Sequence, residues 1–222
     1  MIIMSYDLCI FDLDGTLTDP ELGITRSYLH ALSAFGIHEE HENLVKLIGP
    51  PLRENFRNLY GFSDSDTEKA VKIFREYFVD IGLYENVVYP GIPELLQRLA
   101  DDGKTLAVAT NKVKVYSDSI LAHFGLDKYF SCVSGDKLDG SLTVHGKGEI
   151  IRIVLDELNP QRKCPTVMIG DRKHDMHGAI ENGIDCIGAL WGFGSRAELE
   201  ESGAEVIVQT VEELGQLLLS DY

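Results

Sequence analysis

Residues 8–16 read LCIFDLDGT, an apolar run that ends in two aspartates separated by a single residue. Side chains two positions apart on a strand point to the same side, so Asp12 and Asp14 should lie together. We expect them at the carboxyl end of a buried strand, the edge at which open α/β sheets bind ligands. Two neighbouring carboxylates repel each other unless they share a cation or a proton. The stretch therefore predicts a metal site and acid–base chemistry, although an isolated Asp-x-Asp-Gly is equally compatible with a turn or a helix cap.

Further short apolar runs follow, and they are nearly continuous instead of alternating with polar residues. They lie at residues 105–110, 167–170 and 186–190, with a weaker one at 205–208. Continuous runs are typical of strands that helices cover on both faces, as in a parallel sheet. Apolar residues at helical spacing fill the segments between them, at 92–99, 150–158 and 211–218. This alternation predicts an α/β fold.

Residues 20–86 break the alternation, because they carry helical patterns and no convincing strand. The helical patterns are Ile24-Tyr28-Leu32-Phe35 and Ala70-Ile73-Phe74-Tyr77-Phe78. The Gly49-Pro50-Pro51 loop and residues 61–65 interrupt them. A helical insert is therefore predicted between the first strand and the rest of the sheet. We expect a core domain of residues 1–17 and 90–222 and an all-α cap of residues 18–89.

The composition is that of a globular protein with an acidic surface. The chain has 222 residues, of which 44% are hydrophobic and 25% are charged, and its formal net charge is -16. Nucleic-acid-binding proteins usually carry a basic patch, and no cluster of Lys and Arg occurs in this sequence. An acidic surface repels anions at long range, so an anionic substrate would need positive charge placed at its binding site.

The N-terminal residues and the cysteines both favour a cytoplasmic location. Residues 1–11 contain no basic segment followed by a long apolar run, so we expect neither a signal peptide nor a membrane span. The four cysteines form no Cys-x-x-Cys pair, and all but Cys164 lie in apolar stretches. We therefore interpret the cysteines as core residues in a reducing compartment.

Two polar elements follow the predicted strand at 105–110. Thr110 and Asn111 end that run, where a hydroxyl, an amide and the first N–H groups of the next helix could bind a phosphate oxygen. Lys147 stands near the start of the predicted helix at 149–158 and could supply local positive charge. Each signal is weak alone, because Thr and Asn commonly cap helices and most lysines are solvated.

A further acidic pair follows the predicted strand at 167–170. Asp171 ends that run, and Asp175 lies one helical turn further along the chain. Carboxylate oxygens suit Mg2+, which usually keeps several waters and needs only one or two protein carboxylates. His174 and His177 flank Asp175, but no cysteine or third histidine is near them. We therefore interpret both histidines as surface residues and not as zinc ligands.

Together these elements resemble the haloacid dehalogenase superfamily of phosphatases, and the resemblance covers nearly the whole chain. Order and spacing agree for four motifs, which are Asp12-Leu13-Asp14-Gly15-Thr16, Thr110-Asn111, Lys147, and Gly170-Asp171 with Asp175. The helical insert, residues 48–52 and Tyr89-Pro90-Gly91 resemble the phosphoglycolate phosphatase-like branch. The resemblance implies a doubly wound parallel-sheet, Rossmann-like core with an inserted all-α cap, and Mg2+ as the cofactor.

The resemblance also implies a role for each motif residue. Asp12 would be the nucleophile, and Asp14 would be the general acid and base, with a pKa raised by burial under a closed cap. The metal ligands would be Asp12, the backbone carbonyl of Asp14, and Asp171, and Asp175 would either support the metal or contact Lys147. The phosphate would be bound by Gly15, Thr16, Thr110, Asn111 and Lys147, and Lys147 would also offset the charge of Asp12.

Three residues outside the motifs are candidates for the substrate site. Arg53 follows the Pro50-Pro51 loop, so it either contacts the substrate from the cap or is an ordinary solvated arginine. Trp191 and Phe193 follow the last of the stronger strand patterns, where they either border the site or form a structural turn.

The expected function is Mg2+-dependent hydrolysis of a small phosphomonoester, such as phosphoglycolate or a nucleoside 5'-monophosphate, through an aspartyl-phosphate. True dehalogenases of this superfamily lack an acid aspartate two residues after the nucleophile, so Asp14 favours phosphoryl transfer. The alternatives are a sugar-phosphate mutase and a non-catalytic phosphate-binding protein. We expect no nucleic-acid or membrane partner, and a monomer or small homo-oligomer.

Overall fold

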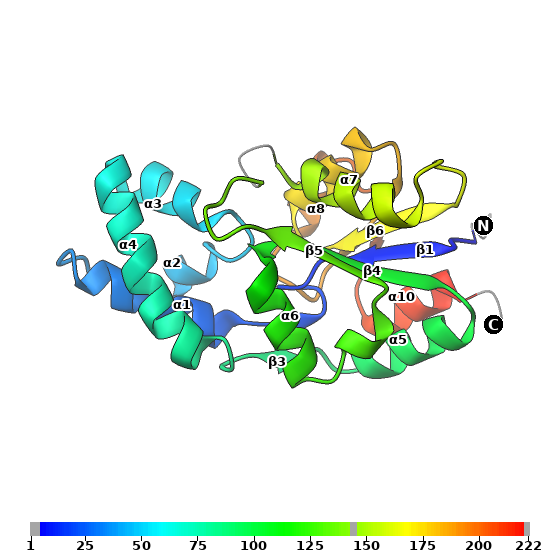
Figure 1. Cartoon of the computed structure of the whole chain (residues 1–222), viewed down its shortest axis with the longest axis horizontal. Helices are drawn as coiled ribbons and strands as arrows, with labels where there is room; N and C mark the ends of the chain where they lie inside the picture. The colour runs from blue at the N-terminus through cyan, green and yellow to red at the C-terminus, as the bar shows by residue number, and fades with distance from the viewer. Residues whose placement is uncertain (1–4, 143–145, 220–222) are drawn as a thin grey trace.

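The computed structural model describes residues 5–142 and 146–219 of the chain. Within these residues the main sheet has six strands in the order β5-β4-β1-β6-β7-β8, and every neighbouring pair is parallel (Figure 1). Their bounds are Leu8–Phe11 (β1), Thr105–Val113 (β4), Cys132–Asp136 (β5), Thr166–Gly170 (β6), Asp185–Ala189 (β7) and Val206–Val208 (β8). The chain runs outward from β1 to β5, returns to the other side of β1, and continues through β6. This doubly wound order confirms the predicted fold class and places the topological switch between β1 and β6.

The strand β5 is the part of the main sheet that the sequence patterns did not reveal. It forms one edge of the sheet and reads CVSGD, in which only the first two residues are apolar. An edge strand has one neighbour, so it needs no continuous apolar run. Gly135 lies where the pairing with β4 shifts register, between Thr110 and Val113.

Helices cover both faces of the sheet (Figure 1). One face carries α5 (Ile92–Asp101), α6 (Lys114–His123) and α10 (Val211–Leu218), and the other carries α7 (Lys147–Leu158), α8 (Lys173–Glu181) and α9 (Arg196–Glu201). The side chains of β1 alternate between the two faces. Leu8 and Ile10 pack in the hydrophobic cluster with α7, whereas Cys9 and Phe11 pack in the cluster with α5. Both faces are buried, which explains the continuous apolar run in the sequence.

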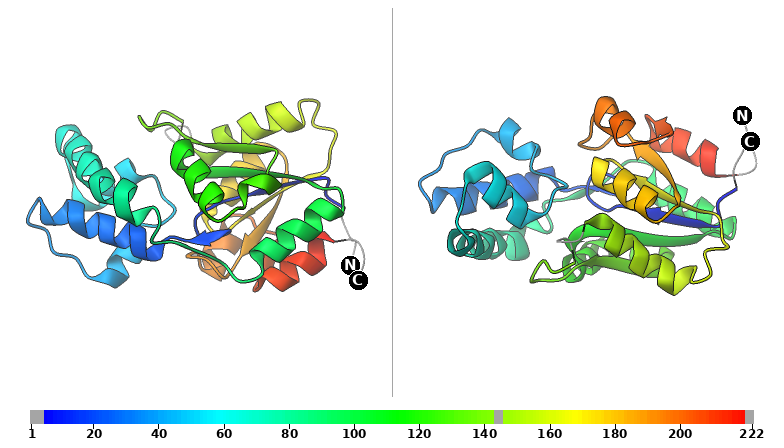
Figure 2. Two further views of the ribbon diagram at one scale, coloured as in Figure 1. Left: turned by 60° about the horizontal axis from the view of Figure 1, so that its bottom comes forward. Right: turned by 90° about the horizontal axis from the view of Figure 1, so that it is seen from above.

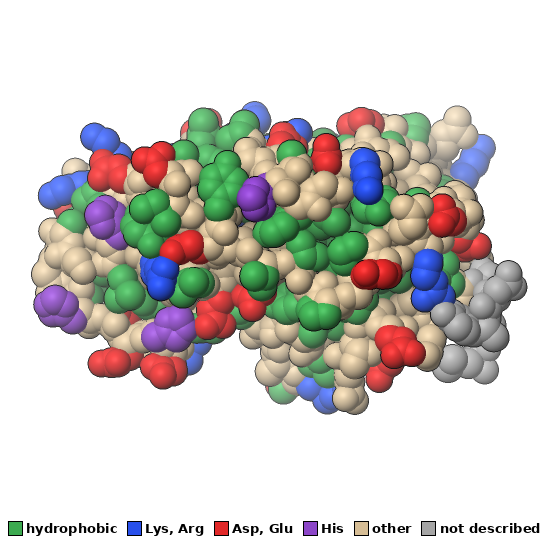
Figure 3. All heavy atoms as spheres, turned by 90° about the horizontal axis from the view of Figure 1, so that it is seen from below, with side chains coloured by type: hydrophobic (Ala, Val, Ile, Leu, Met, Phe, Trp, Pro, Cys, Tyr) green, Lys and Arg blue, Asp and Glu red, His purple; other side chains and the backbone are tan. Residues whose placement is uncertain are grey.

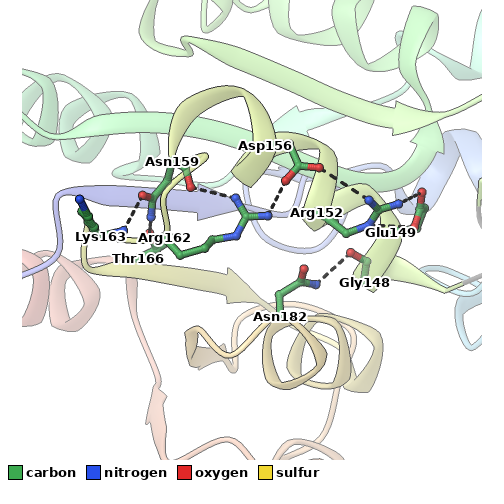
Figure 4. Close-up of polar contacts among 9 residues, drawn as sticks. All are labelled: Gly148, Glu149, Arg152, Asp156, Asn159, Arg162, Lys163, Thr166 and Asn182. Atoms are coloured by element: carbon green, nitrogen blue, oxygen red, sulfur yellow. Dashed lines mark hydrogen bonds and ion pairs between the residues drawn. The ribbon is translucent and has the colours of Figure 1, made fainter.

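The close contact between α7 and α8 brings Lys147 to the edge of the sheet. Asn182, just after α8, donates through Nδ2 to the carbonyl of Gly148 at 2.9 Å (Figure 4) and to that of Gly178 at 2.8 Å. A Cβ at Gly178 would lie 3.0 Å from the backbone nitrogen of Gly148. The first turn of α7 can approach α8 this closely because residue 178 is a glycine and has no Cβ.

Side chains also fix the connection from α7 into β6 (Figure 4). Asn159 donates through Nδ2 to the carbonyl of Cys164 at 2.9 Å and to the hydroxyl of Thr166 at 3.2 Å, and its Oδ1 accepts from the Lys163 backbone at 3.0 Å. Arg162 is paired with Asp156 on α7 at 2.6 Å. These contacts hold the chain where it enters β6, the strand that carries Asp171 at its far end.

The helical insert lies beyond the carboxyl end of the sheet (Figures 1 and 2). It contains α1 (Glu21–Ser33), α2 (His41–Val45), α3 (Leu52–Tyr60), α4 (Asp64–Tyr77) and a π-helical turn, η1 (Phe78–Gly82). Aromatic rings form its core, because Tyr28 packs against Phe56 and Phe74 with centroid distances of 5.5 and 5.0 Å. Asn55 donates to the Tyr28 hydroxyl at 2.8 Å, so this buried polar group is satisfied.

The insert is joined to the sheet through two short segments that the sequence patterns did not reveal as strands. They are β2 (Thr18–Asp19) and β3 (Val87–Val88), which pair antiparallel. A segment of two residues is too short to show the alternation typical of a strand, so the sequence pattern could not predict β2 and β3. Just beyond, Gly23 of α1 crosses Gly82 of η1 so closely that a Cβ on Gly23 would overlap the Gly82 carbonyl.

Charged side chains are spread over the surface. On the face shown in Figure 3, Lys and Arg stand apart from one another among acidic and hydrophobic side chains. Among the described residues, no helix combines the length and the apolar character needed to cross a bilayer. Residues 1–4, on which the signal-peptide expectation partly rests, lie outside the described residues. The four cysteines are free, and all but the half-buried Cys164 are buried.

Leu96 on α5 offers a test of the packing beneath the sheet. Its side chain is fully buried, so Leu96→Ala should lower the free energy of unfolding by about 2–5 kcal/mol. The matched control is Leu59→Ala on α3, where the leucine is 63% exposed and the change should stay within about 0.5 kcal/mol. Urea unfolding measures both, and equal losses would contradict this assignment of the core.

Candidate active site

Four of the residues predicted from the sequence meet at the topological switch of the sheet. Asp12 follows β1 and Asp171 follows the neighbouring β6, so parallel pairing places their side chains at the same edge. Lys147 begins α7, and Asp175 lies in the first turn of α8. All four are buried, and Asp171 and Asp175 are entirely inaccessible to solvent.

Lys147 bridges two of these carboxylates. Its Nζ lies 2.8 Å from Asp12 Oδ1 and also forms an ion pair with Asp175. Burial opposes the charged form of the lysine, but Asp12 and Asp175 together raise the pKa of Lys147 above its ordinary value. The ammonium group therefore stays charged in a position that water scarcely reaches, and it offsets one of the surrounding negative charges.

Asp171 is held by the backbone and by Thr16. Its Oδ2 accepts from the Phe193 backbone at 2.8 Å, and its Oδ1 accepts from the Thr16 hydroxyl at 3.4 Å. Burial, together with the neighbouring Asp175 and Asp12, raises the pKa of Asp171 well above its usual range. Burial also raises the pKa of Asp175, to about 6, although Lys147 opposes the shift.

The carboxylates of Asp12, Asp171 and Asp175 fit a metal ion. Each offers an oxygen, and these oxygens lie within 4.8 Å of one another. Three buried carboxylates face a single buried ammonium, so their ionised forms leave an excess of negative charge that a divalent cation would neutralise. An all-oxygen donor set of this kind suits Mg2+.

Glycines allow the backbone to approach Asp171. Gly15 has a φ of +85°, a conformation that favours glycine, and a Cβ there would overlap the Asp171 carboxylate. A Cβ on Gly192 would overlap the carbonyl of Gly15. Trp191 donates through Nε1 to the Thr16 carbonyl at 3.0 Å, which ties the segment after β7 to the loop after β1.

Asp14 has a different partner, Lys112, which the sequence analysis did not select. The two form an ion pair in which the lysine side chain is only 7% exposed and the aspartate side chain 11%. Burial raises the pKa of Asp14, and Lys112 partly opposes this shift. Asp14 Oδ1 has no hydrogen-bond partner among the described residues. Lys112 directly follows Thr110-Asn111 in the sequence. This position beside a predicted motif is the feature that could have identified Lys112 as a site residue.

A cavity of about 270 Å³ opens above these residues. Asp12, Asp14 and Thr110 line the part that belongs to the sheet. Residues 47–52, which we call the proline loop, line it from the helical insert, together with aromatic residues such as Phe78. The cavity therefore joins the switch point of the sheet to the insert.

Three arginines of the insert line the cavity. The predicted Arg53 is one of them, and its Nε and Nη2 donate to Glu68 at 2.6 and 2.9 Å. Arg57 and Arg75 were not selected from the sequence, because helical spacing alone does not show which face of an insert meets a cavity. Arg75 donates to the Leu138 carbonyl at 2.7 Å, and no described carboxylate lies within ion-pair distance of it. Burial lowers the pKa of Arg75.

Not all the predicted phosphate-binding residues line the cavity. Thr110 and Asn111 do so, whereas Gly15, Thr16 and Lys147 are not among the lining residues. The Thr16 hydroxyl is directed at Asp171, and Asn111 donates through Nδ2 to the Gly49 carbonyl of the proline loop at 3.2 Å. Trp191 and Phe193 do not line the cavity either. They border the site because Trp191 donates to the Thr16 carbonyl and the Phe193 backbone donates to Asp171.

The interpretation of the two histidines as surface residues is only partly correct. His177 is exposed, but His174 is half-buried in the first turn of α8. Burial and the nearby cations, Lys147 first among them, lower the pKa of His174 to about 4. The sequence could not show this, because the burial comes from packing of the α8 N-terminus against its neighbours.

Comparisons with known proteins agree with this geometry. A family model described as haloacid dehalogenase-like hydrolase matches residues 9–189. The 5'-nucleotidase of Pseudomonas aeruginosa is 48% identical over 198 residues, which cover 88% of each chain. The tyrosine-protein kinase PtkA of Mycobacterium tuberculosis is 36% identical over 219 residues, which cover 96% of this chain and 73% of that protein. A crystal structure described as a predicted phosphatase from Clostridium acetobutylicum has a TM-score of 0.91 at 42% identity and covers 96% of this chain and 98% of that one.

The chain therefore belongs to the haloacid dehalogenase-like hydrolases, as its motifs predicted. Within that family it is a phosphatase.

Magnesium should stabilise the protein, because a ligand that binds only the folded state raises its stability. At a concentration about 100 times the dissociation constant the gain is about 2.7 kcal/mol, seen as a higher Tm in a comparison of Mg2+ with EDTA. Asp171→Asn should abolish this response. Without magnesium the same variant should melt no lower than wild type, since it removes one of three crowded carboxylates.

Asp156→Asn is the matched control for the magnesium experiment. Its carboxylate side chain is 57% exposed and pairs only with arginines at the surface of α7 and the following loop. The control should keep the full response to Mg2+. An unchanged response in Asp171→Asn would exclude Asp171 as a ligand.

Proposed function

We propose that this phosphatase is a Mg2+-dependent phosphomonoesterase that works through a phosphorylated Asp12. The observation that carries the proposal is the contrast between the two aspartates on the cavity floor. Asp12 forms an ion pair with the buried Lys147 at 2.8 Å, whereas burial raises the pKa of Asp14 and favours its protonated form. Two residues of the same type are thus suited to opposite roles, a nucleophile and a proton donor.

The proposed reaction has two displacements at phosphorus. In the first, a carboxylate oxygen of Asp12 forms a bond to phosphorus while the bond to the ester oxygen breaks, and Asp14 gives its proton to that oxygen. The leaving group departs as an alcohol. In the second, Asp14 takes a proton from water, whose oxygen attacks phosphorus, and the bond to Asp12 breaks to release phosphate. Splitting the reaction in this way replaces one difficult step by two easier ones.

The surrounding residues stabilise charge in this scheme. Lys147 orients Asp12 through their ion pair. The Thr110 hydroxyl accepts from the Lys112 backbone at 3.2 Å, so its own proton is available to a phosphoryl oxygen. Bound Mg2+ would neutralise charge on the phosphoryl group, held by Asp12, Asp171, Asp175 and the carbonyl of Asp14.

We also propose that residues 18–89 act as the cap that selects the leaving group. The insert supplies the proline loop and three arginines to the cavity, whereas the sheet supplies the reacting carboxylates. A cap of this kind can exclude water from the site when it lies against the sheet.

A nucleoside 5'-monophosphate is the substrate class that the cavity supports best. The cavity of about 270 Å³ approaches the volume of about 300 Å³ at which pockets for drug-sized ligands begin. That is far more room than glycolate needs. Phe78 and Tyr116 offer aromatic surface for a base, and Arg75 offers a guanidinium group that forms no ion pair with a carboxylate of the described residues. The 48% identity to a protein named 5'-nucleotidase supports the same choice.

Substitution of the two aspartates tests the mechanism. With Mg2+ and a nucleoside 5'-monophosphate, Asp12→Asn should abolish phosphate release, because an amide oxygen is a poor nucleophile. Asp14→Asn should lower kcat by about 10²–10⁴-fold, the usual contribution of a general acid–base group. Colorimetric phosphate release measures both, with Asp156→Asn as the unaffected control. Full activity of Asp12→Asn would exclude the aspartyl-phosphate.

A substrate panel tests the choice of leaving group. The kcat/KM for nucleoside 5'-monophosphates should exceed that for phosphoglycolate. Arg75→Gln should raise KM for the nucleotides about tenfold and leave kcat nearly unchanged, because a hydrogen bond to a charged group contributes about 1.5–3 kcal/mol. Arg196→Gln is the control, since Arg196 is exposed and its ion pair within the described part of the chain is with Glu200 on its own helix. A preference for phosphoglycolate would overturn the assignment.

A further inference from the structure

Two side chains of the sheet domain bind neighbouring carbonyls of the proline loop. Arg172, the residue after Asp171, donates through a guanidinium nitrogen to the carbonyl of Ile48. Asn111, the residue after Thr110, donates through Nδ2 to the carbonyl of Gly49 at 3.2 Å. The two donors come from different parts of the sheet domain, the loop after β6 and the last part of β4, and they bind consecutive peptide units of the insert.

Arg172 is held in place for this contact. Its Nε donates to Glu198 on α9 at 2.9 Å, and its side chain is only 12% exposed. Its backbone N–H donates to Asp175 Oδ2 at 3.0 Å. The guanidinium group is thus fixed at one side by an acidic residue, which leaves its other side directed at the proline loop. A charged donor to a carbonyl contributes more than a neutral one.

The loop is shaped to receive Arg172. Gly49 has a φ of +105°, a conformation that favours glycine. A Cβ at this position would lie 3.1 Å from two atoms of the Arg172 side chain, which is tighter than ordinary packing. Backbone conformation and space therefore both require glycine where the arginine crosses the loop.

We propose that Arg172 and Asn111 form a latch that holds the proline loop, and with it the insert, closed over the cavity. The proposal deepens the proposed function, since it assigns closure of that same site to two positioning residues. The latch residues are chain neighbours of Asp171 and Thr110, so a shift of either strand end also shifts the loop that lines the cavity. Opening of the insert must break both hydrogen bonds.

The latch also explains why Asn111 lies in the cavity wall. Its Nδ2 donates to the Gly49 carbonyl, so the amide predicted to bind phosphate is directed at the insert. Its Oδ1 is buried and has no hydrogen-bond partner among the described residues. We assign Asn111 to closure of the loop, and phosphate binding at this strand end to the hydroxyl of Thr110.

A distance measurement tests the latch without any substrate. Nitroxide labels on Leu59→Cys in the insert and Ile180→Cys in the sheet domain, two exposed positions, report their separation by pulsed electron resonance. Cys164→Ser removes the one native cysteine that is not buried. The latched protein should give one narrow distance, and Arg172→Met and Asn111→Ala should each add longer distances. Arg196→Met, on α9, is the matched control and should leave the distribution unchanged.

Kinetics supply the second measurement. With the substrate that wild type turns over best, Arg172→Met should lower kcat/KM about tenfold, because a charged hydrogen bond that closes the site is lost. Arg172→Lys keeps a cationic donor and should recover part of that loss. The kinetic and distance results together distinguish closure of the site from a general structural role of Arg172. A general structural role would lower stability without broadening the distribution of distances between the labels.

An unchanged distance distribution in both Arg172→Met and Asn111→Ala would overturn the latch. If Arg172→Met does not fold, Asn111→Ala alone decides by the same criterion. Failure of the proposed substrate class is a separate result, since it would appear as a different preference in the wild-type panel while the label distances still respond to the latch variants.

Discussion

Crowding of negative charge at one edge of the sheet is the constraint on which the rest of this structure depends. Asp12, Asp171 and Asp175 are buried together, and Lys147 offsets only one of their charges. Such an arrangement is unfavourable for stability alone, because desolvated like charges repel. The surrounding backbone nevertheless conforms to it, since the loop after β1 approaches Asp171 through Gly15. Because the cluster at the switch point is unfavourable for stability, its presence there is explained by binding of a ligand and not by stabilisation of the fold.

The sequence predicted the parts of the fold in which local pattern and environment agree. Strands covered on both faces give continuous apolar runs, so β1, β4, β6 and β7 were visible, whereas the polar edge strand β5 and the two-residue pair β2 and β3 were not. Asp12 and Asp171 were predicted for a similar reason, because strand ends fix where they lie, and Lys147 and Asp175 were predicted from the order and spacing of the motifs. Arg57 and Arg75 were missed because their positions depend on how the insert docks, and the burial of His174 was missed because it depends on how α8 packs. Lys112 was missed although it lies on β4 directly after Thr110-Asn111.

The site is built from two parts of the chain, the edge of the sheet and the helical insert, which contribute different kinds of residue. The sheet edge offers carboxylates whose positions are fixed by parallel pairing and by glycine contacts, so little freedom remains there. The insert offers longer side chains on helices that have their own aromatic core around Tyr28 and Phe56. That aromatic core belongs to the same hydrophobic cluster as Phe11 of β1 and Leu95 of α5. The insert and the sheet are therefore packed together through shared apolar contacts, although they present different kinds of side chain to the cavity.

The crossing of Gly23 and Gly82 has a mechanical consequence. The chain enters the insert beside Gly23 and leaves it beside Gly82, and the two backbones touch where no side chain could fit. The two segments that join the insert to the sheet domain are therefore in direct backbone contact at one point. A Cβ on Gly23 would overlap the Gly82 carbonyl, so a single methyl group there would force the two segments apart, at a place remote from phosphorus.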